Sequence, residues 1–182
     1  GESKAEITLI YLDRRSTPNP PTRNNLGREL NPEFKLAYES NKFLWEPSDG
    51  FENIKSDNGI WIGEIRETNA WIQTSEELMV TPGTSQIFHF ILKNETSSDM
   101  VKIYWKNEGD ESYSEEKVAY VPVVPNDREF REYSWPIGQE ASRYFFMGTM
   151  GSVANRSTFT YADSEKGKIT GFRIVPASGL TV

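Results

Sequence analysis

The stretch Ile87–Val124, IFHFILKNETSSDMVKIYWKNEGDESYSEEKVAYVPVV, decides the fold class of this chain. It holds three apolar and aromatic runs, which two polar segments rich in Asn, Ser, Gly, Asp and Glu separate. Because successive side chains of a strand point to opposite faces, the runs are typical of strands and the polar segments of turns. In the middle run, Val101, Ile103 and Trp105 share one phase, which we expect to be buried. The opposite phase, expected to face solvent, holds Lys102, Tyr104 and Lys106.

The same pattern continues on both sides of this stretch. Upstream, Asn58-Gly59 separates two short apolar runs, which is a strong signal for a β-hairpin. Downstream, Pro125-Asn126-Asp127 marks a turn, and Lys168–Val175 predicts a final strand that ends before Pro176. The whole chain contains roughly ten to twelve such segments, which predicts an all-β fold made of two packed antiparallel sheets.

The chain length fits a single domain with an attached segment. Its 182 residues can bury a core without help from disulfides or metals. Residues 46–182 hold most of the predicted strands and form the expected β-sandwich domain. Residues 1–45 differ, because the strand candidate Glu6–Asp13 is followed by a stretch with four prolines. We expect this segment to be an N-terminal strand and proline-rich arm packed on the sandwich.

The composition excludes several functions and disfavours others. The chain has no cysteine, which excludes thiolate catalysis and cysteine-ligated zinc. Its net charge is −7 and it has no basic stripe, so we expect no nucleic-acid partner. No apolar run approaches the roughly 20 residues that a transmembrane helix needs. The beginning, Gly1-Glu2-Ser3, looks trimmed, and we expect an exported protein of a bacterial cell surface or periplasm.

Short motifs spread over residues 50–178 resemble those of a known family. They are Tyr104-Trp105, Tyr113-Ser114-Glu115, Pro125-Asn126-Asp127, Tyr133 and Ile169–Pro176. In this order they resemble the galactose-binding-like jelly-roll modules of secreted polysaccharide-degrading proteins from bacteria, often of Bacteroides type. The resemblance implies a jelly-roll sandwich that binds carbohydrate, with no cofactor other than a structural calcium ion. Residues 1–45 have no counterpart in the family, and residues 138–166 are longer than its equivalent stretch.

Residue types that catalyse reactions are scarce in this sequence. His89 is the only histidine, and it lies between two phenylalanines, where a hydrogen-bonded packing residue is the more common finding. Five acidic residues in the range 108–116 could serve glycoside hydrolysis or calcium binding, but their polar neighbours favour a solvated loop. Asp49 with Asp57 and Asn58 forms a second candidate calcium set. The sequence therefore predicts a protein that is not an enzyme.

Aromatic side chains carry the binding hypothesis. Phe, Trp and Tyr make up 13% of the chain, and indole and phenol rings stack well on the apolar face of a sugar. The candidate carbohydrate-binding residues are Trp61, Trp71, Tyr104, Tyr113, Asn69, Gln73 and Arg143. Asn69 and Gln73 offer amides beside Trp71, while Arg143, like Arg173, could clamp an acidic sugar. Trp105 and Trp135 are expected in the core, and Trp45 could lie in either place.

These observations lead to one main hypothesis and two alternatives. The main hypothesis is a non-catalytic module that binds a polysaccharide or oligosaccharide by aromatic stacking and hydrogen bonds. The first alternative is a structural or protein-interaction sandwich domain of a surface protein. The second is a glycan-cleaving enzyme with a sandwich fold, which would need a cleft with two facing carboxylates.

Overall fold

The structure is a computed structural model that describes residues 4–14, 32–35, 45–57, 60–75, 77–79, 86–136 and 167–178. These residues form eleven β-strands and no helix, which confirms the all-β fold class. Within this described part, the search for an apolar helix long enough to cross a bilayer finds none.

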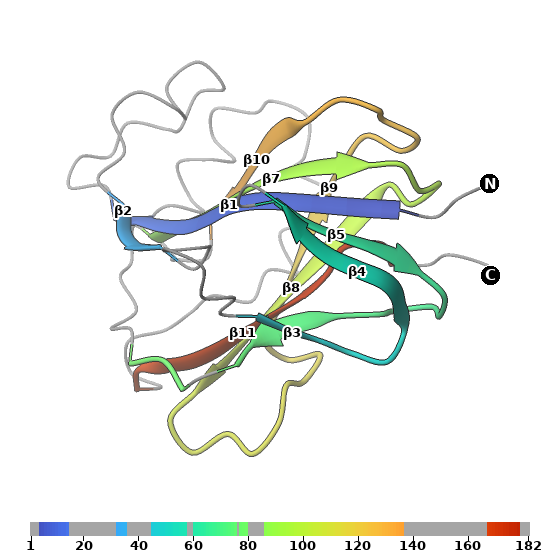
Figure 1. Ribbon diagram of the computed structural model, residues 1–182. Helices are drawn as coiled ribbons and strands as arrows, with labels where there is room; N and C mark the ends of the chain where they lie inside the picture. The colour runs from blue at the N-terminus through green and yellow to red at the C-terminus, as the bar shows by residue number, and fades with distance from the viewer. Residues whose placement is uncertain are drawn as a thin grey trace.

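Two antiparallel sheets face each other (Figure 1). In order across the first sheet lie β10 (Arg131–Pro136), β7 (Gln86–Asn94), β1 (Lys4–Arg14), β5 (Ile60–Ile65) and β4 (Phe51–Asp57), with β2 (Pro32–Lys35) also paired to β1. In order across the second sheet lie β3 (Trp45–Pro47), β6 (Ile72–Thr74), β11 (Ile169–Val175), β8 (Met100–Asn107) and β9 (Val118–Pro122). The chain crosses between the sheets repeatedly, as it does in a jelly roll.

The core lies between the two sheets. Phe88 of β7 meets Phe172 of β11 with their ring centroids 5.2 Å apart, so aromatic rings from both sheets interdigitate. The predicted phase of β8 is confirmed, because Val101, Ile103 and Trp105 are completely buried. Trp45 is also buried and belongs to this core. The side chain of Trp135 lies outside the described residues.

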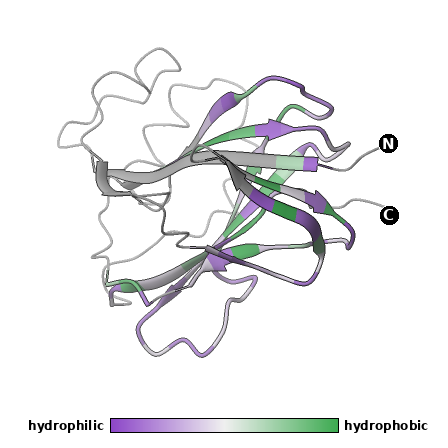
Figure 2. Ribbon diagram, viewed as in Figure 1, coloured by the Kyte–Doolittle hydropathy of each residue, from purple (hydrophilic) through white to green (hydrophobic). Residues whose placement is uncertain are grey.

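The strand ends follow the local sequence signals. Asp57 pairs with Ile60, so β4 and β5 form the hairpin that Asn58-Gly59 predicts. The last strand, β11, ends at Val175, directly before Pro176, as expected. The connection from β8 to β9 consists largely of hydrophilic residues (Figure 2). The N-terminal strand β1 lies between β5 and β7 in the first sheet, whereas most of the proline-rich stretch is outside the described residues.

A buried polar network joins the end of β7 to the connection between β9 and β10. The Asn94 amide nitrogen donates to the carbonyl oxygens of Ser98 at 2.8 Å and Val124 at 2.9 Å, and its oxygen accepts from the Thr96 hydroxyl at 2.6 Å. The Asn94 side chain therefore satisfies backbone groups that would otherwise be buried without partners.

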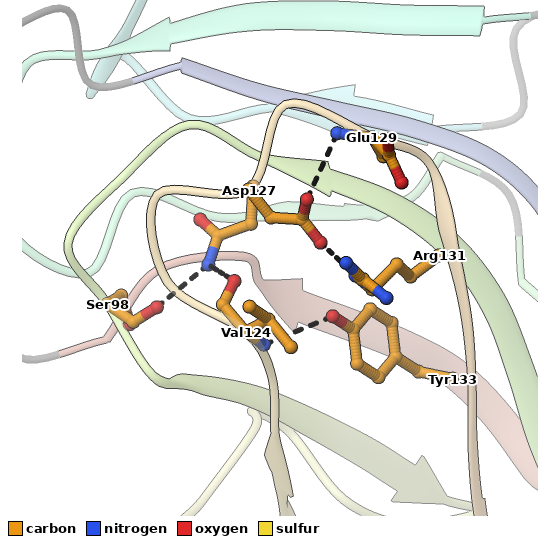
Figure 3. A network of polar contacts seen from close by, with 7 residues as sticks. Ser98, Val124, Asp127, Glu129, Arg131 and Tyr133 are labelled. Atoms are coloured by element: carbon orange, nitrogen blue, oxygen red, sulfur yellow. Dashed lines mark hydrogen bonds and ion pairs between the residues drawn. The ribbon is translucent and has the colours of Figure 1, made fainter.

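The same network fixes the turn after Pro125. The Asp127 carboxylate accepts hydrogen bonds from the Glu129 backbone N–H and from the Arg131 side chain (Figure 3). Hydrogen bonding from Arg131 lowers the pKa of Asp127. The Tyr133 hydroxyl accepts from the Val124 N–H at 3.1 Å, so this turn is tied to β10 as well.

Candidate ligand-binding face

The second sheet turns one side toward the core and the other side away from it. We name the latter the outer face and define it by Gln73 of β6, Lys102, Tyr104 and Lys106 of β8, and Arg173 of β11. Alternation along each strand places these residues opposite the buried phase. The 108–117 loop, which links β8 to β9, contacts this face through Tyr113 and Glu115. The sheet and this loop together form the candidate site.

Arg173 lies against two aromatic rings on the outer face. Its guanidinium carbon is 4.2 Å from the centroid of the Trp71 ring and 4.4 Å from the centroid of the Tyr113 ring. A planar cation at these distances is attracted by the π-systems and packs flat on apolar surface. The contacts join residues from three parts of the chain, and all three side chains are partly exposed.

A chain of hydrogen bonds restrains the Arg173 guanidinium. Arg173 donates from Nε and Nη2 to the Gln73 carbonyl oxygen at 3.1 and 2.7 Å. Gln73 in turn donates from Nε2 to the Glu46 carboxylate at 2.5 Å. Burial lowers the pKa of Arg173, although an arginine side chain keeps its charge at ordinary pH. The Gln73 carbonyl is thus occupied by Arg173.

Tyr113 reaches the sheet because residue 171 is a glycine. A Cβ atom added at Gly171 would lie 2.5 Å from the Tyr113 hydroxyl oxygen and 3.2 Å from Thr74 Oγ1. Lys106 also contacts this ring, with its Nζ 5.1 Å from the ring centroid. Burial raises the pKa of Tyr113, and a hydrogen bond with Thr74 opposes that rise.

Glu115 covers the part of the outer face that Lys102 and Tyr104 form. Its carboxylate accepts hydrogen bonds from the Tyr104 hydroxyl at 2.5 Å and the Tyr120 hydroxyl at 2.9 Å, and Lys102 Nζ lies 3.5 Å away. The hydrogen bond from Tyr104 lowers the pKa of Glu115, whereas burial raises the pKa of Tyr104. Val118 and Val175 pack with Tyr104 in a small second apolar cluster on this side of the sheet.

Each of the two aromatic residues that contact Arg173 lines a pocket of its own. The first, named the Tyr113 pocket, has a volume of about 390 Å³, and its lining includes Gln73, Ser75, Glu77, Lys106, Asp110 and Tyr113. The second, named the Trp71 pocket, has a volume of about 590 Å³, and its lining includes Glu46, Asp49, Glu67, Asn69 and Trp71. Each pocket therefore combines one aromatic ring with several polar side chains.

The structure brings several of the predicted site residues together. Trp71, Gln73 and Tyr113 meet around Arg173. Asn69 lines the Trp71 pocket and has a left-handed backbone with φ 63°. Tyr104 is on the predicted side of β8.

The expected exposure of Tyr104 is wrong. Its side chain is only 8% exposed, because the 108–117 loop folds back and places Glu115 on its hydroxyl.

Of the two remaining predicted site residues, one is in the other sheet and one is outside the described residues. Trp61 is in β5 of the first sheet, where it pairs with Ile7 and Ser56, and its side chain is outside the described residues. Arg143 is also outside the described residues.

The sequence offers Arg173 only as an alternative to Arg143 for clamping an acidic sugar, yet Arg173 contacts both Trp71 and Tyr113 on the outer face. A single charge in the otherwise apolar strand ITGFRIV is the signal that could have singled it out.

The candidate acid–base and calcium residues have other partners. Burial raises the pKa of Asp110, but hydrogen bonds from Lys117 and from the Asn107 N–H outweigh it and leave this pKa below its usual value. His89 is completely buried, as expected of a packing residue. Within the described ranges, three or more acidic or histidine side chains do not gather around one point. Structural calcium stays a prediction.

No protein-family model, curated protein or solved structure matches this chain. The function is therefore inferred from the residues of the outer face.

Proposed function

We propose that this protein binds carbohydrate without cleaving it, and that the Tyr113 pocket, with Arg173 and Trp71 beside it, is the sugar site. The observation that carries the proposal is a pocket of about 390 Å³ in which hydrogen-bond donors and acceptors surround a partly exposed phenol ring. A sugar has hydroxyl groups around its edge and C–H groups on its faces, so it is bound by this combination of groups.

The walls of the Tyr113 pocket are held in place before any ligand arrives. Asn107 donates from Nδ2 to the Gly167 carbonyl at 3.0 Å, and the Lys168 N–H donates to the Glu108 carboxylate at 3.0 Å. The Asp110 carboxylate accepts from the Asn107 N–H at 2.8 Å. Because the pocket wall is already ordered, binding loses less conformational entropy. This smaller loss offsets part of the free energy needed to displace water from a shallow polar site.

The carboxylates of the pocket support binding more than hydrolysis. A glycoside hydrolase needs two carboxyl groups across the scissile bond, and one of them must have a raised pKa to act as the acid. Glu77 and Asp110 both line the Tyr113 pocket, but the pKa of Asp110 is lowered by its partners. Export to a bacterial surface or periplasm, which the family resemblance implies, belongs to the same proposal.

The test is affinity electrophoresis of the purified chain through gels that contain neutral or acidic polysaccharides. We expect at least one polymer to retard the wild type, and Trp71→Ala and Tyr113→Ala to weaken its binding at least about tenfold, or roughly 1.4 kcal/mol. Phe130→Ala is the matched control, because Phe130 is an exposed aromatic residue on the connection between β9 and β10. It should bind like the wild type.

Circular dichroism and thermal unfolding check that each variant is folded. A folded wild type that no polysaccharide in a broad panel retards would contradict the proposal. The same holds if Phe130→Ala loses binding while folded Trp71→Ala and Tyr113→Ala keep it.

A further inference from the structure

We propose that the ligand is an acidic glycan, and that its carboxylate or sulfate group is bound by Lys106, which lines the Tyr113 pocket, and by Arg173, which contacts the Tyr113 ring. This inference rests on the proposed function, because it names the class of sugar that the same site takes. It starts from the charges on the outer face and from what each of them already contacts.

Four cations belong to the outer face or to the 108–117 loop, and two of them form ion pairs. Lys102 lies 3.5 Å from the Glu115 carboxylate, and Lys117 forms an ion pair with Asp110. Among the residues that the structure describes, neither Lys106 nor Arg173 has a carboxylate within ion-pair distance. No carboxylate thus contacts these two positive charges directly, although Asp110 lies within electrostatic range of Lys106 and Glu46 within that of Arg173.

The two cations lie beside the same aromatic ring. Arg173 is 4.4 Å and Lys106 is 5.1 Å from the centroid of Tyr113, measured from the guanidinium carbon and from Nζ. Lys106 also lines the pocket. An anionic group on a sugar bound beside Tyr113 would therefore lie near two cations that contact the same ring.

Arg173 is pre-arranged for this role. The Gln73 carbonyl oxygen accepts one hydrogen bond from Nε and one from Nη2, and the rings of Trp71 and Tyr113 pack against the guanidinium. A guanidinium has five N–H donors, so donors remain after Gln73 is satisfied. A rigid planar fork matches the oxygens of a carboxylate or sulfate better than a flexible ammonium does.

The acidic lining of the pocket is compatible with such a ligand. Glu77 and Asp110 can accept hydrogen bonds from sugar hydroxyls, which are donors, while the anionic group is bound by Lys106 and Arg173. The charge of Asp110 is balanced by Lys117. Because the whole chain is negative, a polyanion without the right shape is repelled over long range, so retention must come from local contacts.

The experiment measures affinity for matched polymers at near-physiological salt. The carboxylate probe is polygalacturonate, its neutral partner is the same polymer with the carboxyl groups reduced to alcohols, and the sulfate probe is a sulfated galactan. Polyglutamate serves as a polyanion without sugar. We expect at least tenfold tighter binding of one acidic glycan than of the reduced polymer, and little binding of polyglutamate.

Charge-removing variants locate the effect. Lys106→Gln and Arg173→Gln should each weaken binding of the acidic glycan at least tenfold, while their matched controls Lys55→Gln and Arg128→Gln, at exposed positions away from the outer face, should not. Arg173→Lys keeps the charge but loses the fork, and we expect intermediate binding. Among the described residues the Lys106 side chain forms no hydrogen bond or ion pair that its variant would lose, so this variant tests the inference even if Arg173→Gln unfolds.

The outcomes separate the two proposals. Equal binding of polygalacturonate, sulfated galactan and the reduced polymer would overturn the acidic-glycan inference and leave carbohydrate binding intact. Equal binding of polyglutamate and the acidic glycans would show that charge alone causes retention, and would also overturn the acidic-glycan inference. If none of the glycans nor any neutral polysaccharide binds, the proposed function fails and the inference fails with it.

Discussion

A single glycine allows the 108–117 loop to pack against the outer face. At position 171 only a hydrogen leaves room for the Tyr113 hydroxyl, because an added Cβ would lie 2.5 Å from that oxygen. The phenol in turn contacts Arg173 and Lys106, so one small residue in β11 sets where a loop residue and two cations meet.

This close approach predicts a specific rescue. Gly171→Ala should destabilise the fold by about 1–3 kcal/mol, the usual cost of overpacking. Tyr113→Phe in the same chain removes the clashing oxygen, and we expect it to recover most of that loss. Urea unfolding of the two single variants and the double variant measures the coupling. Additive effects of the two substitutions would contradict the described packing.

Some of these residue-level features could be read from the sequence and others could not. Alternation in MVKIYWKN correctly assigns Trp105 to the core and Lys106 to the outer face. It fails for Tyr104, because alternation reports the face of a strand and not whether a loop later covers it. The meeting of Trp71 with Arg173 depends on β6 pairing with β11, which no local pattern specifies.

At the scale of elements, the 108–117 loop is the part that turns a sheet face into a site. Its carboxylates are tied to the sheet and to the loop itself, through Glu115 to Tyr104 and through Asp110 to Lys117 and Asn107. The polar composition of this segment predicts a solvated loop, and most of its residues are exposed, but composition does not reveal the tyrosine and lysine partners that the fold brings to it.

The loop should respond to acid in a defined direction. The pKa values of Asp110 and Glu115 are lowered in the folded chain, so their contribution to stability is present above the unfolded values near 4. That contribution is lost as the pH falls through the lower folded values. Because the Glu115 side chain is 64% exposed, solvent screening limits its share to less than about 1 kcal/mol.

Comparison with Glu115→Gln isolates this effect. Unfolding free energies from pH 7 to pH 3 should fall less steeply in Glu115→Gln than in the wild type, because the amide does not titrate. Glu116→Gln is the matched control, because Glu116 is an exposed carboxylate of the same loop, whereas Tyr104 and Tyr120 donate their hydrogen bonds to Glu115. Parallel curves for Glu115→Gln and the wild type would show that Glu115 is not stabilised by Tyr104 in the folded chain.

For the molecule as a whole, strands of the second sheet and the 108–117 loop together supply the side chains of the candidate site. Hairpin signals such as Asn58-Gly59 and the apolar phases of the strands were sufficient to predict two packed antiparallel sheets. The order of strands within the sheets was not predictable, because β11 joins β6 and β8 from segments far away in sequence. That order alone explains why Arg173 became part of the candidate site.

The most direct test of the central claim is a nuclear magnetic resonance titration of the labelled chain with galacturonate oligosaccharides. We predict that the side-chain signals of Trp71 and Arg173 and the amide signals of Lys106 and Tyr113 shift together and saturate, while those around Phe130 stay in place. The claim that the outer face binds the ligand would be contradicted by chemical-shift changes only on the first sheet or on the connection between β9 and β10, with the signals of the outer face unchanged at saturation.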